Sequence, residues 1–146
     1  MATAEAVVAY ADSSALVKLV LDEAESPALK HYLDSVELTS SELVLTEVPR
    51  GVRRAAARDS VPTQELLERA EAVLNAVSLV PLDQSLLLGA GALDEPSLRA
   101  LDAIHVVTAV SLHPLDAFLT YDIRQAAAAR LAGLRTVAPG AEDSGV

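Results

Sequence analysis

Four acidic side chains lie in apolar surroundings, where a carboxylate is costly unless it is paired or binds a cation. Two come directly after short apolar runs, and two lie at or beside the apolar faces of predicted helices; they are Asp12, Asp122, Glu47 and Asp102. Carboxylate oxygens are the ligands that Mg²⁺ prefers in proteins, and a bound divalent cation supports phosphoryl transfer. The four acids are therefore candidates for a metal-dependent site.

Each acid, taken singly, also has a structural explanation. The two that follow apolar runs can cap the helices that begin after them. Asp102 can pair with Arg99, three residues earlier on the same helix, and Glu47 can pair with Arg50 in a similar way. If the acids share one crevice they repel each other unless a cation lies between them, and we expect this crowding to raise the pKa of at least one.

The elements that must position these acids follow a strand–helix order. Apolar runs indicate buried strands at residues 6–11, 36–39, 77–83, 116–122 and 134–139. The stretches between them predict helices at residues 13–22, 27–33, from 40 or 41 onward, 63–77, 84–92, 96–112 and 122–131. This order, with short connections, predicts an α/β fold with a parallel sheet. We expect one domain over residues 1–140 and a flexible tail over residues 141–146.

Local signals predict where several helices begin and break. Ser13 or Ser14 is expected to cap the first helix, and Ser40 or Ser41 is expected to cap the third. Pro49 lies inside the third predicted helix and should bend or break it, because proline lacks the N–H that the helix needs.

The carboxyl ends of parallel strands form one edge of a sheet, and ligands gather at that edge in open α/β folds. Asp12 and Asp122 each end a predicted strand, so both are expected there. Asp116 starts its strand and is expected at the opposite edge.

Four segments together resemble the PIN-domain ribonucleases, and more narrowly the VapC toxins of type II toxin–antitoxin systems. The segments are "VVAYADSSALVKLVLDE", "SSELVLTEVPRGVRRA", "LRALDAIHVVTAV" and "LDAFLTYDIRQAAAARLAGLRTVAP". They run from about Val7 to Pro139 in the family's order and spacing. The resemblance implies a three-layer α/β/α sandwich with a central parallel sheet, and an acidic pocket that binds Mg²⁺ or Mn²⁺ and cleaves RNA.

The resemblance also implies roles for particular residues. The family's four acids fall, in order, on Asp12, Glu47, Asp102 and Asp122, and its supporting hydroxyl residues fall on Ser13 and Thr120. Mg²⁺ usually takes one or two carboxylates directly and the rest through water, and we expect Asp12 and Asp102 to be the direct ligands. Glu47 and Asp122 would act through water or hold a second ion.

The charge of the chain bears on its partners. The net charge is −10 and the pI is near 4.6, whereas a nucleic-acid binder is usually basic. A short stretch is nevertheless basic and either contacts RNA phosphates or forms a solvated face; its residues are Arg50, Arg53, Arg54 and Arg58. The resemblance adds two expected partners: a VapB-type antitoxin whose segment covers the acidic pocket, and a second copy of the chain in a homodimer.

Other features narrow the expected compartment. Cysteine is absent, so neither a disulfide framework nor a thiolate metal site is expected. The apolar runs are too short to span a membrane and the start of the chain lacks a secretory signal, so we expect a cytoplasmic protein with no membrane partner.

His105 is interpreted as a buried histidine satisfied by a neighbour, and His31 and His113 are given no role.

Two other functions stay open. The chain could be a catalytically idle PIN-like RNA-binding module, although such a module has no reason to keep four mutually repelling carboxylates. It could also be another acid-based, metal-dependent phosphoryl-transfer enzyme, such as a phosphatase with a covalent aspartyl-phosphate. Those phosphatases have "DxD" after the first strand, whereas this chain has "DSS".

Overall fold

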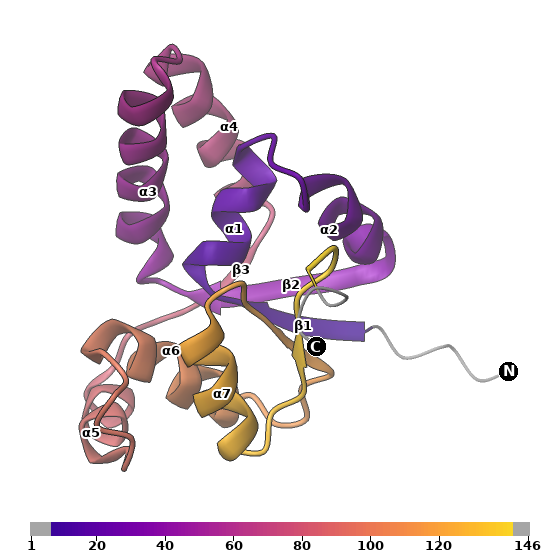
Figure 1. Cartoon of the computed structure of the whole chain (residues 1–146). Helices are drawn as coiled ribbons and strands as arrows, with labels where there is room; N and C mark the ends of the chain where they lie inside the picture. Colours follow the sequence, from indigo (N-terminus) through magenta and orange to yellow (C-terminus); the bar gives the residue numbers. More distant parts are fainter. Residues whose placement is uncertain (1–6, 142–146) are drawn as a thin grey trace, which may run out of the picture.

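A parallel five-stranded sheet forms the centre of the molecule (Figure 1). The computed structural model describes residues 7–141, and its strands are β1 (Val7–Ala11), β2 (Val36–Ser41), β3 (Ser78–Val80), β4 (Ala117–Leu119) and β5 (Thr136–Val137). Their order across the sheet is β3-β2-β1-β4-β5, and every neighbouring pair is parallel. The predicted parallel sheet is therefore confirmed.

Helices cover both faces of the sheet, as Figure 1 shows. One layer holds α1 (Ser13–Val20), α2 (Ser26–Tyr32), the short 3-10 helix η1 (Leu33–Ser35), α3 (Val44–Asp59) and α4 (Thr63–Asn75). The other layer holds α5 (Gln84–Ala92), α6 (Ala100–Ser111) and α7 (Ile123–Leu131). The predicted α/β/α sandwich is confirmed. Within residues 7–141, every helix is too short or too polar to cross a membrane.

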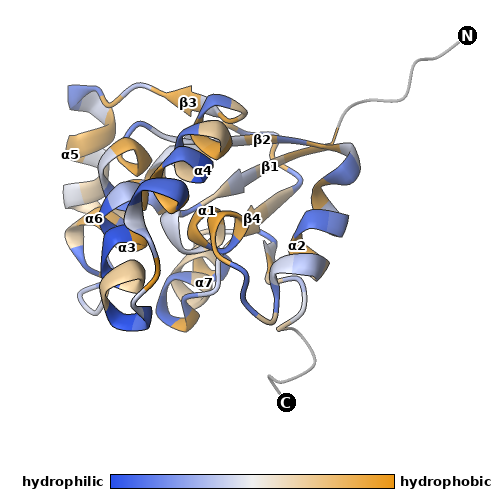
Figure 2. Ribbon diagram, turned by 90° about the horizontal axis from the view of Figure 1, so that it is seen from above, coloured by the Kyte–Doolittle hydropathy of each residue, from blue (hydrophilic) through white to orange (hydrophobic). Residues whose placement is uncertain are grey.

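Side chains of β1 point alternately into two separate cores, as the period of a strand requires. Ala9 and Ala11 lie in the larger core, with residues of α1 to α4. Tyr10 lies in the smaller core with residues of α6 and α7, and its ring stacks on that of Phe118 in β4, with centroids 5.4 Å apart. The helices also have one buried side. Along α3, hydrophobic residues recur among hydrophilic ones, as Figure 2 shows.

The third helix begins later than predicted because the two serines expected to cap it belong to β2. Ser40 and Ser41 pair with Leu79 and Val80 of β3. The Ser40 hydroxyl donates to the carbonyl oxygen of Ala11 at 2.6 Å, which ties β2 to the end of β1. The prediction that either serine caps this helix was wrong, since the sheet takes both residues.

Two other predicted helix starts also differ from the structure. The cap of α1 is Asp12, not Ser13 or Ser14, because its Oδ1 accepts a hydrogen bond from Ala15 N at 3.1 Å. The helix predicted from residue 96 begins at residue 100 as α6. Ser97 does not cap it, since its hydroxyl donates to the Glu95 carboxylate at 2.8 Å.

Pro49 does not break α3, which runs without interruption from Val44 to Asp59. A proline removes one hydrogen bond of the helix, and Pro49 lies in the second turn, close to the end where backbone N–H groups lack helical partners in any case. Burial of Val48 and Val52 against the core holds the helix on both sides of the proline.

The predicted tail falls almost entirely outside the described residues. Of residues 141–146, only Ala141 is described, and its N–H donates to the carbonyl oxygen of Ala138 at 2.9 Å.

Candidate active site

The crevice of the sheet lies where the strand order reverses. β1 has β2 on one side and β4 on the other, so the chain leaves β1 and β4 toward opposite halves of the sheet. Ligands of open α/β folds bind outside the carboxyl ends of the strands at such a switch point. Asp12 directly follows β1 and Asp122 lies shortly after β4, so both lie at the predicted edge.

A cavity of about 680 Å³ opens at this edge. It is walled by α1, α3, the start of α6 and the segment between β4 and α7. Three of the four acids line it, each from a different element: Glu47 from α3, Asp102 from α6 and Asp122 from the cap of α7. Segments far apart in the sequence thus bring three carboxylates to one cavity.

Asp12 lies buried beside this cavity, with 2% of its surface exposed. Its Oδ1 accepts hydrogen bonds from Ser14 Oγ at 2.6 Å and from Ala15 N at 3.1 Å. Its Oδ2 accepts one from Thr120 Oγ1 at 2.5 Å. Burial raises the pKa of Asp12, and these three donors act in the opposite direction. The donors satisfy the carboxylate but leave one of its roughly four acceptor sites open.

Thr120 joins the two acids that follow the strands. While its hydroxyl donates to Asp12, it accepts a hydrogen bond from Asp122 N at 3.0 Å. The Asp122 carboxylate in turn caps α7, with Oδ1 accepting from Arg124 N at 2.9 Å and Gln125 N at 3.2 Å. Capping is therefore real for both acids, and it uses only Oδ1 of each carboxylate.

Asp102 shows the crowding expected from the sequence. Burial raises its pKa most, and the charge of Asp122 raises it further, with a smaller contribution from Glu47. Arg99 opposes these effects from 3.8 Å, but the Arg99 side chain is 77% exposed, so the pair is worth little. The Arg99 explanation thus accounts for only part of the environment of Asp102.

Glu47 is held by a buried histidine. Its Oε1 lies 2.6 Å from His105 Nε2, and Nδ1 of the same ring lies 2.6 Å from the Tyr10 hydroxyl. His105 is 1% exposed, which confirms that it is a buried histidine satisfied by its neighbours. The partner of Glu47 is therefore His105 on α6 and not Arg50, which is exposed.

Only part of the arginine stretch of α3 lines the cavity. Arg54 and Arg58 line the cavity on the same face as Glu47, whereas Arg50 and Arg53 do not line it. Arg58 also pairs with Asp59 at 3.0 Å.

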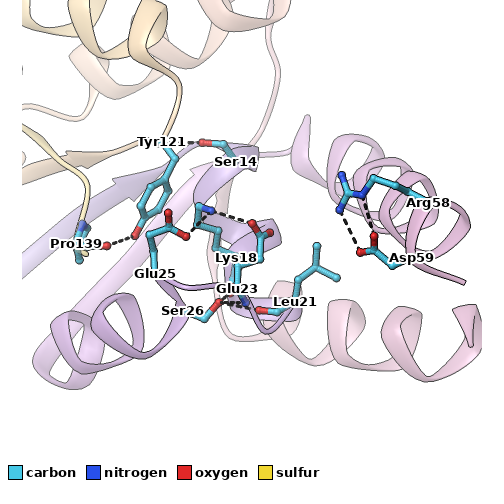
Figure 3. A network of polar contacts seen from close by, with 10 residues as sticks. All are labelled: Ser14, Lys18, Leu21, Glu23, Glu25, Ser26, Arg58, Asp59, Tyr121 and Pro139. Carbon is cyan, nitrogen blue, oxygen red and sulfur yellow. Dashed lines mark hydrogen bonds and ion pairs between the residues drawn. The ribbon is translucent and has the colours of Figure 1, made fainter. Parts of the chain in front are cut away.

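Two residues of the site, Ser14 and Lys18, were missed from the sequence. The hydroxyl that bonds Asp12 is that of Ser14, while Ser13 lines the cavity. Lys18 lines it too, and its Nζ lies 3.0 Å from both Glu23 and Glu25 and 4.8 Å from the centre of the Tyr121 ring (Figure 3). The available signal was a single lysine in the apolar helix "SSALVKLV", one turn after Ser14.

The donor chemistry of the cavity fits a hard divalent cation. Its acidic side supplies carboxylate oxygens, and the pKa of Asp102 is raised first by burial and then by the charge of Asp122. Among residues 7–141, no three histidine, cysteine or acidic side chains are already arranged around one ion position. Mg²⁺ does not need such a cage, because it keeps several waters and takes only one or two carboxylates directly.

Comparisons with known proteins place the chain in a family. The PIN domain family model matches residues 9–131. Ribonuclease VapC35 of Mycobacterium tuberculosis is 37% identical over 137 residues, which cover 90% of this chain and 96% of that protein. Ribonuclease VapC46 of the same species is 38% identical over 138 residues, covering 89% of this chain and 96% of that protein.

The fold also matches a solved structure, that of VapBC2 from Rickettsia felis bound to a promoter DNA fragment. The TM-score is 0.68 at 13% identity, and the match covers 91% of this chain and 99% of that chain. At this identity the match supports the fold alone, while the family model and the mycobacterial relatives cover nearly the whole sequence. The chain therefore belongs to the PIN-domain family, and within it to the VapC group.

Proposed function

We propose that the chain is a VapC-type toxin that cleaves RNA internally with the help of Mg²⁺ or Mn²⁺. The observation that carries the proposal is the convergence of Glu47, Asp102 and Asp122 on one cavity, with Asp12 buried beside it at the switch point of the sheet. The names of the mycobacterial relatives, both ribonucleases, support the reaction class.

In this proposal the four acids hold the cation and orient the reacting groups. Asp102 and Asp12 would bind it directly, Asp12 through its one open acceptor site, and Glu47 and Asp122 would hold its waters or a second ion. When bound, the cation supplies charge for the phosphate and lowers the pKa of an attacking water. Thr120 and Ser14 would fix the Asp12 carboxylate through the hydrogen bonds described above.

Basic side chains on the cavity wall would hold the RNA. Lys18, Arg54 and Arg58 line the cavity together with the acids, so the site is not uniformly negative despite the net charge of −10. A phosphate backbone could lie between the cation on one side and these side chains on the other. The local arrangement, not the net charge, is what allows an acidic protein to act on a polyanion.

The proposal includes two protein partners. A VapB-type antitoxin would neutralise the toxin by covering the acidic cavity with a basic segment, which suits the charge of this chain. The similar Rickettsia felis structure contains VapBC2, which supports an antitoxin partner. The second partner is another copy of the chain, with which it would form a homodimer in the cytoplasm.

Expression in a bacterial host without the antitoxin, followed by sequencing of RNA ends, tests the proposal. We expect growth arrest and new RNA ends at a small number of sites within one class of RNA. An idle binding module would give no new ends, and a phosphatase would hydrolyse a generic phosphate ester without cutting RNA. Either result would overturn the proposal.

A further inference from the structure

Three side chains from three elements form a buried chain of hydrogen bonds that ends at the cavity. Tyr10 of β1 and His105 of α6 are 0% and 1% exposed, and their O···N distance is 2.6 Å. His105 Nε2 lies 2.6 Å from Glu47 Oε1, and the Glu47 side chain is 16% exposed at the cavity wall. These hydrogen bonds therefore connect the centre of the smaller core with a carboxylate of the candidate site.

The direction of these hydrogen bonds follows from the groups involved. A carboxylate only accepts, so the ring nitrogen that faces Glu47, Nε2, carries the hydrogen. Neutral imidazole then has a lone pair on Nδ1, which accepts from the Tyr10 hydroxyl. The Glu47 carboxylate thus places the hydrogen on Nε2, and the Tyr10 hydroxyl, by donating to Nδ1, holds the ring in the orientation from which Nε2 faces Glu47.

This arrangement sets the position of Glu47 relative to Asp102. His105 lies one helical turn after Asp102 on α6, whereas Glu47 belongs to α3 on the other side of the sheet. The hydrogen bond from His105 consequently ties the α3 carboxylate to the same helix that carries Asp102. Without it, Glu47 would be free to choose other rotamers at the cavity wall.

We propose that His105 is a positioning residue that holds the Glu47 carboxylate for metal and water, and that Tyr10 holds the His105 ring in the required orientation. The inference rests on the proposed function, since it assigns a supporting role in the same site. Partners of this kind typically change metal affinity or activity by about 10- to 100-fold when they are removed.

Two substitutions of the same histidine separate positioning from simple core packing. His105→Gln places an amide N–H near the position of Nε2 and can still donate to Glu47. His105→Asn reaches only the position of Nδ1 and leaves Glu47 without its donor. Both remove the ring from the core, so a packing role predicts similar losses from both, while a positioning role predicts that only His105→Asn is damaging.

Mn²⁺ affinity of the purified full chain, measured by calorimetric titration, is the first readout. We expect about 10- to 100-fold weaker binding for His105→Asn and a loss of less than about threefold for His105→Gln. His31→Asn is the matched control, because the His31 side chain is 89% exposed, and it should bind like the native chain. Equal affinities for the Asn and Gln variants at His105 would overturn the inference.

Glu47→Gln in the same titration distinguishes failure of this inference from failure of the proposed function. If Glu47→Gln and Asp102→Asn both bind Mn²⁺ like the native chain, the acidic site itself is wrong. If these two lose affinity while folded His105→Asn does not, the site stands and the positioning role is wrong.

A second readout keeps the inference testable if His105→Asn does not fold. Long-range ¹H–¹⁵N correlation spectra of histidine-labelled protein should show His105 with its hydrogen on Nε2. Tyr10→Phe should lower Mn²⁺ affinity, since the hydroxyl that holds the His105 ring toward Glu47 is gone. A native His105 with its hydrogen on Nδ1, or native affinity in Tyr10→Phe, would overturn the proposal.

Discussion

At the scale of single residues, two acids of the proposed site also have structural roles. Asp12 and Asp122 cap the helices that follow them, and both still lie at the switch point of the sheet. A cap uses only some of the acceptor sites of a carboxylate, so capping and cation binding are compatible. A role as helix cap therefore does not exclude a role in cation binding for Asp12 or Asp122.

Asp102→Asn keeps the shape of the side chain and removes its charge. We expect weaker Mg²⁺ and Mn²⁺ binding by calorimetry, because one proposed direct ligand loses its negative charge. The melting temperature without metal should stay unchanged or rise, because Asp122 and burial disfavour the charge of Asp102.

Asp116→Asn is the matched control for this substitution. Asp116 lies at the opposite end of its strand, and its Oδ2 accepts from Val8 N at 2.8 Å, a bond that an asparagine oxygen can keep. Native metal affinity in Asp102→Asn, or an equal loss of affinity in Asp116→Asn, would show that Asp102 is not a metal ligand.

Ser14→Ala removes one of the three donors to the buried Asp12 carboxylate. We expect the free energy of unfolding to fall by about 1–3 kcal/mol, as for the loss of a hydrogen bond to a buried charged group. Ser13→Ala removes a hydroxyl that lines the cavity, so it should act on RNA cleavage with little change in stability. Urea denaturation of both variants checks this, and equal stability losses would contradict the hydrogen-bond assignment.

At the scale of elements, α3 carries both kinds of charge that the proposed reaction needs. Glu47, Arg54 and Arg58 share the face that lines the cavity, and Arg50 and Arg53 lie off it. Gly51 lets α3 approach α1 closely on this face, since an added Cβ would lie 3.2 Å from the Val17 side chain. The helix therefore fixes the spacing between proposed metal ligand and proposed phosphate contacts.

Arg54→Ala should weaken RNA binding and reduce its dependence on salt. Loss of one phosphate contact on a single strand lowers the slope of log affinity against log salt by about 0.7. Metal affinity should be unchanged, because Arg54 is no ligand. Arg53→Ala is the control, because Arg53 does not line the cavity, and binding of labelled RNA at several salt concentrations compares the two. The same slope for both variants would show that Arg54 belongs to a solvated face and does not contact RNA phosphate.

The sequence predicted the elements well where burial decides them and poorly where hydrogen bonds of single side chains decide them. Strands such as β1 and helices such as α4 were located by apolar pattern. The start of α3 was misplaced because Ser40 donates to Ala11 within the sheet instead of capping the helix, and α6 begins at residue 100 instead of residue 96. For the same reason the sequence could place His105 in the core but could not show that it contacts Glu47.

At the scale of the whole molecule, negative charge collected in one cavity should link metal binding to stability. Mg²⁺ or Mn²⁺ at about 100 times its Kd should stabilise the folded chain by about 2.7 kcal/mol. For a chain of this size that corresponds to a rise in Tm of about 5–10 °C. Thermal unfolding with and without millimolar metal measures it, with Ca²⁺-free buffer throughout. An unchanged Tm at millimolar metal would count against a cation site.

Cleavage of total RNA by the purified chain tests the central claim most directly. The protein is first treated with EDTA, and Mg²⁺ or Mn²⁺ is then added back to the native chain and to Asp102→Asn. We predict no cleavage in EDTA, full recovery by the native chain, and at least about 100-fold slower cleavage by Asp102→Asn, because transition-state charge is no longer stabilised. Cleavage that continues in EDTA, or native rates from Asp102→Asn, would contradict the account.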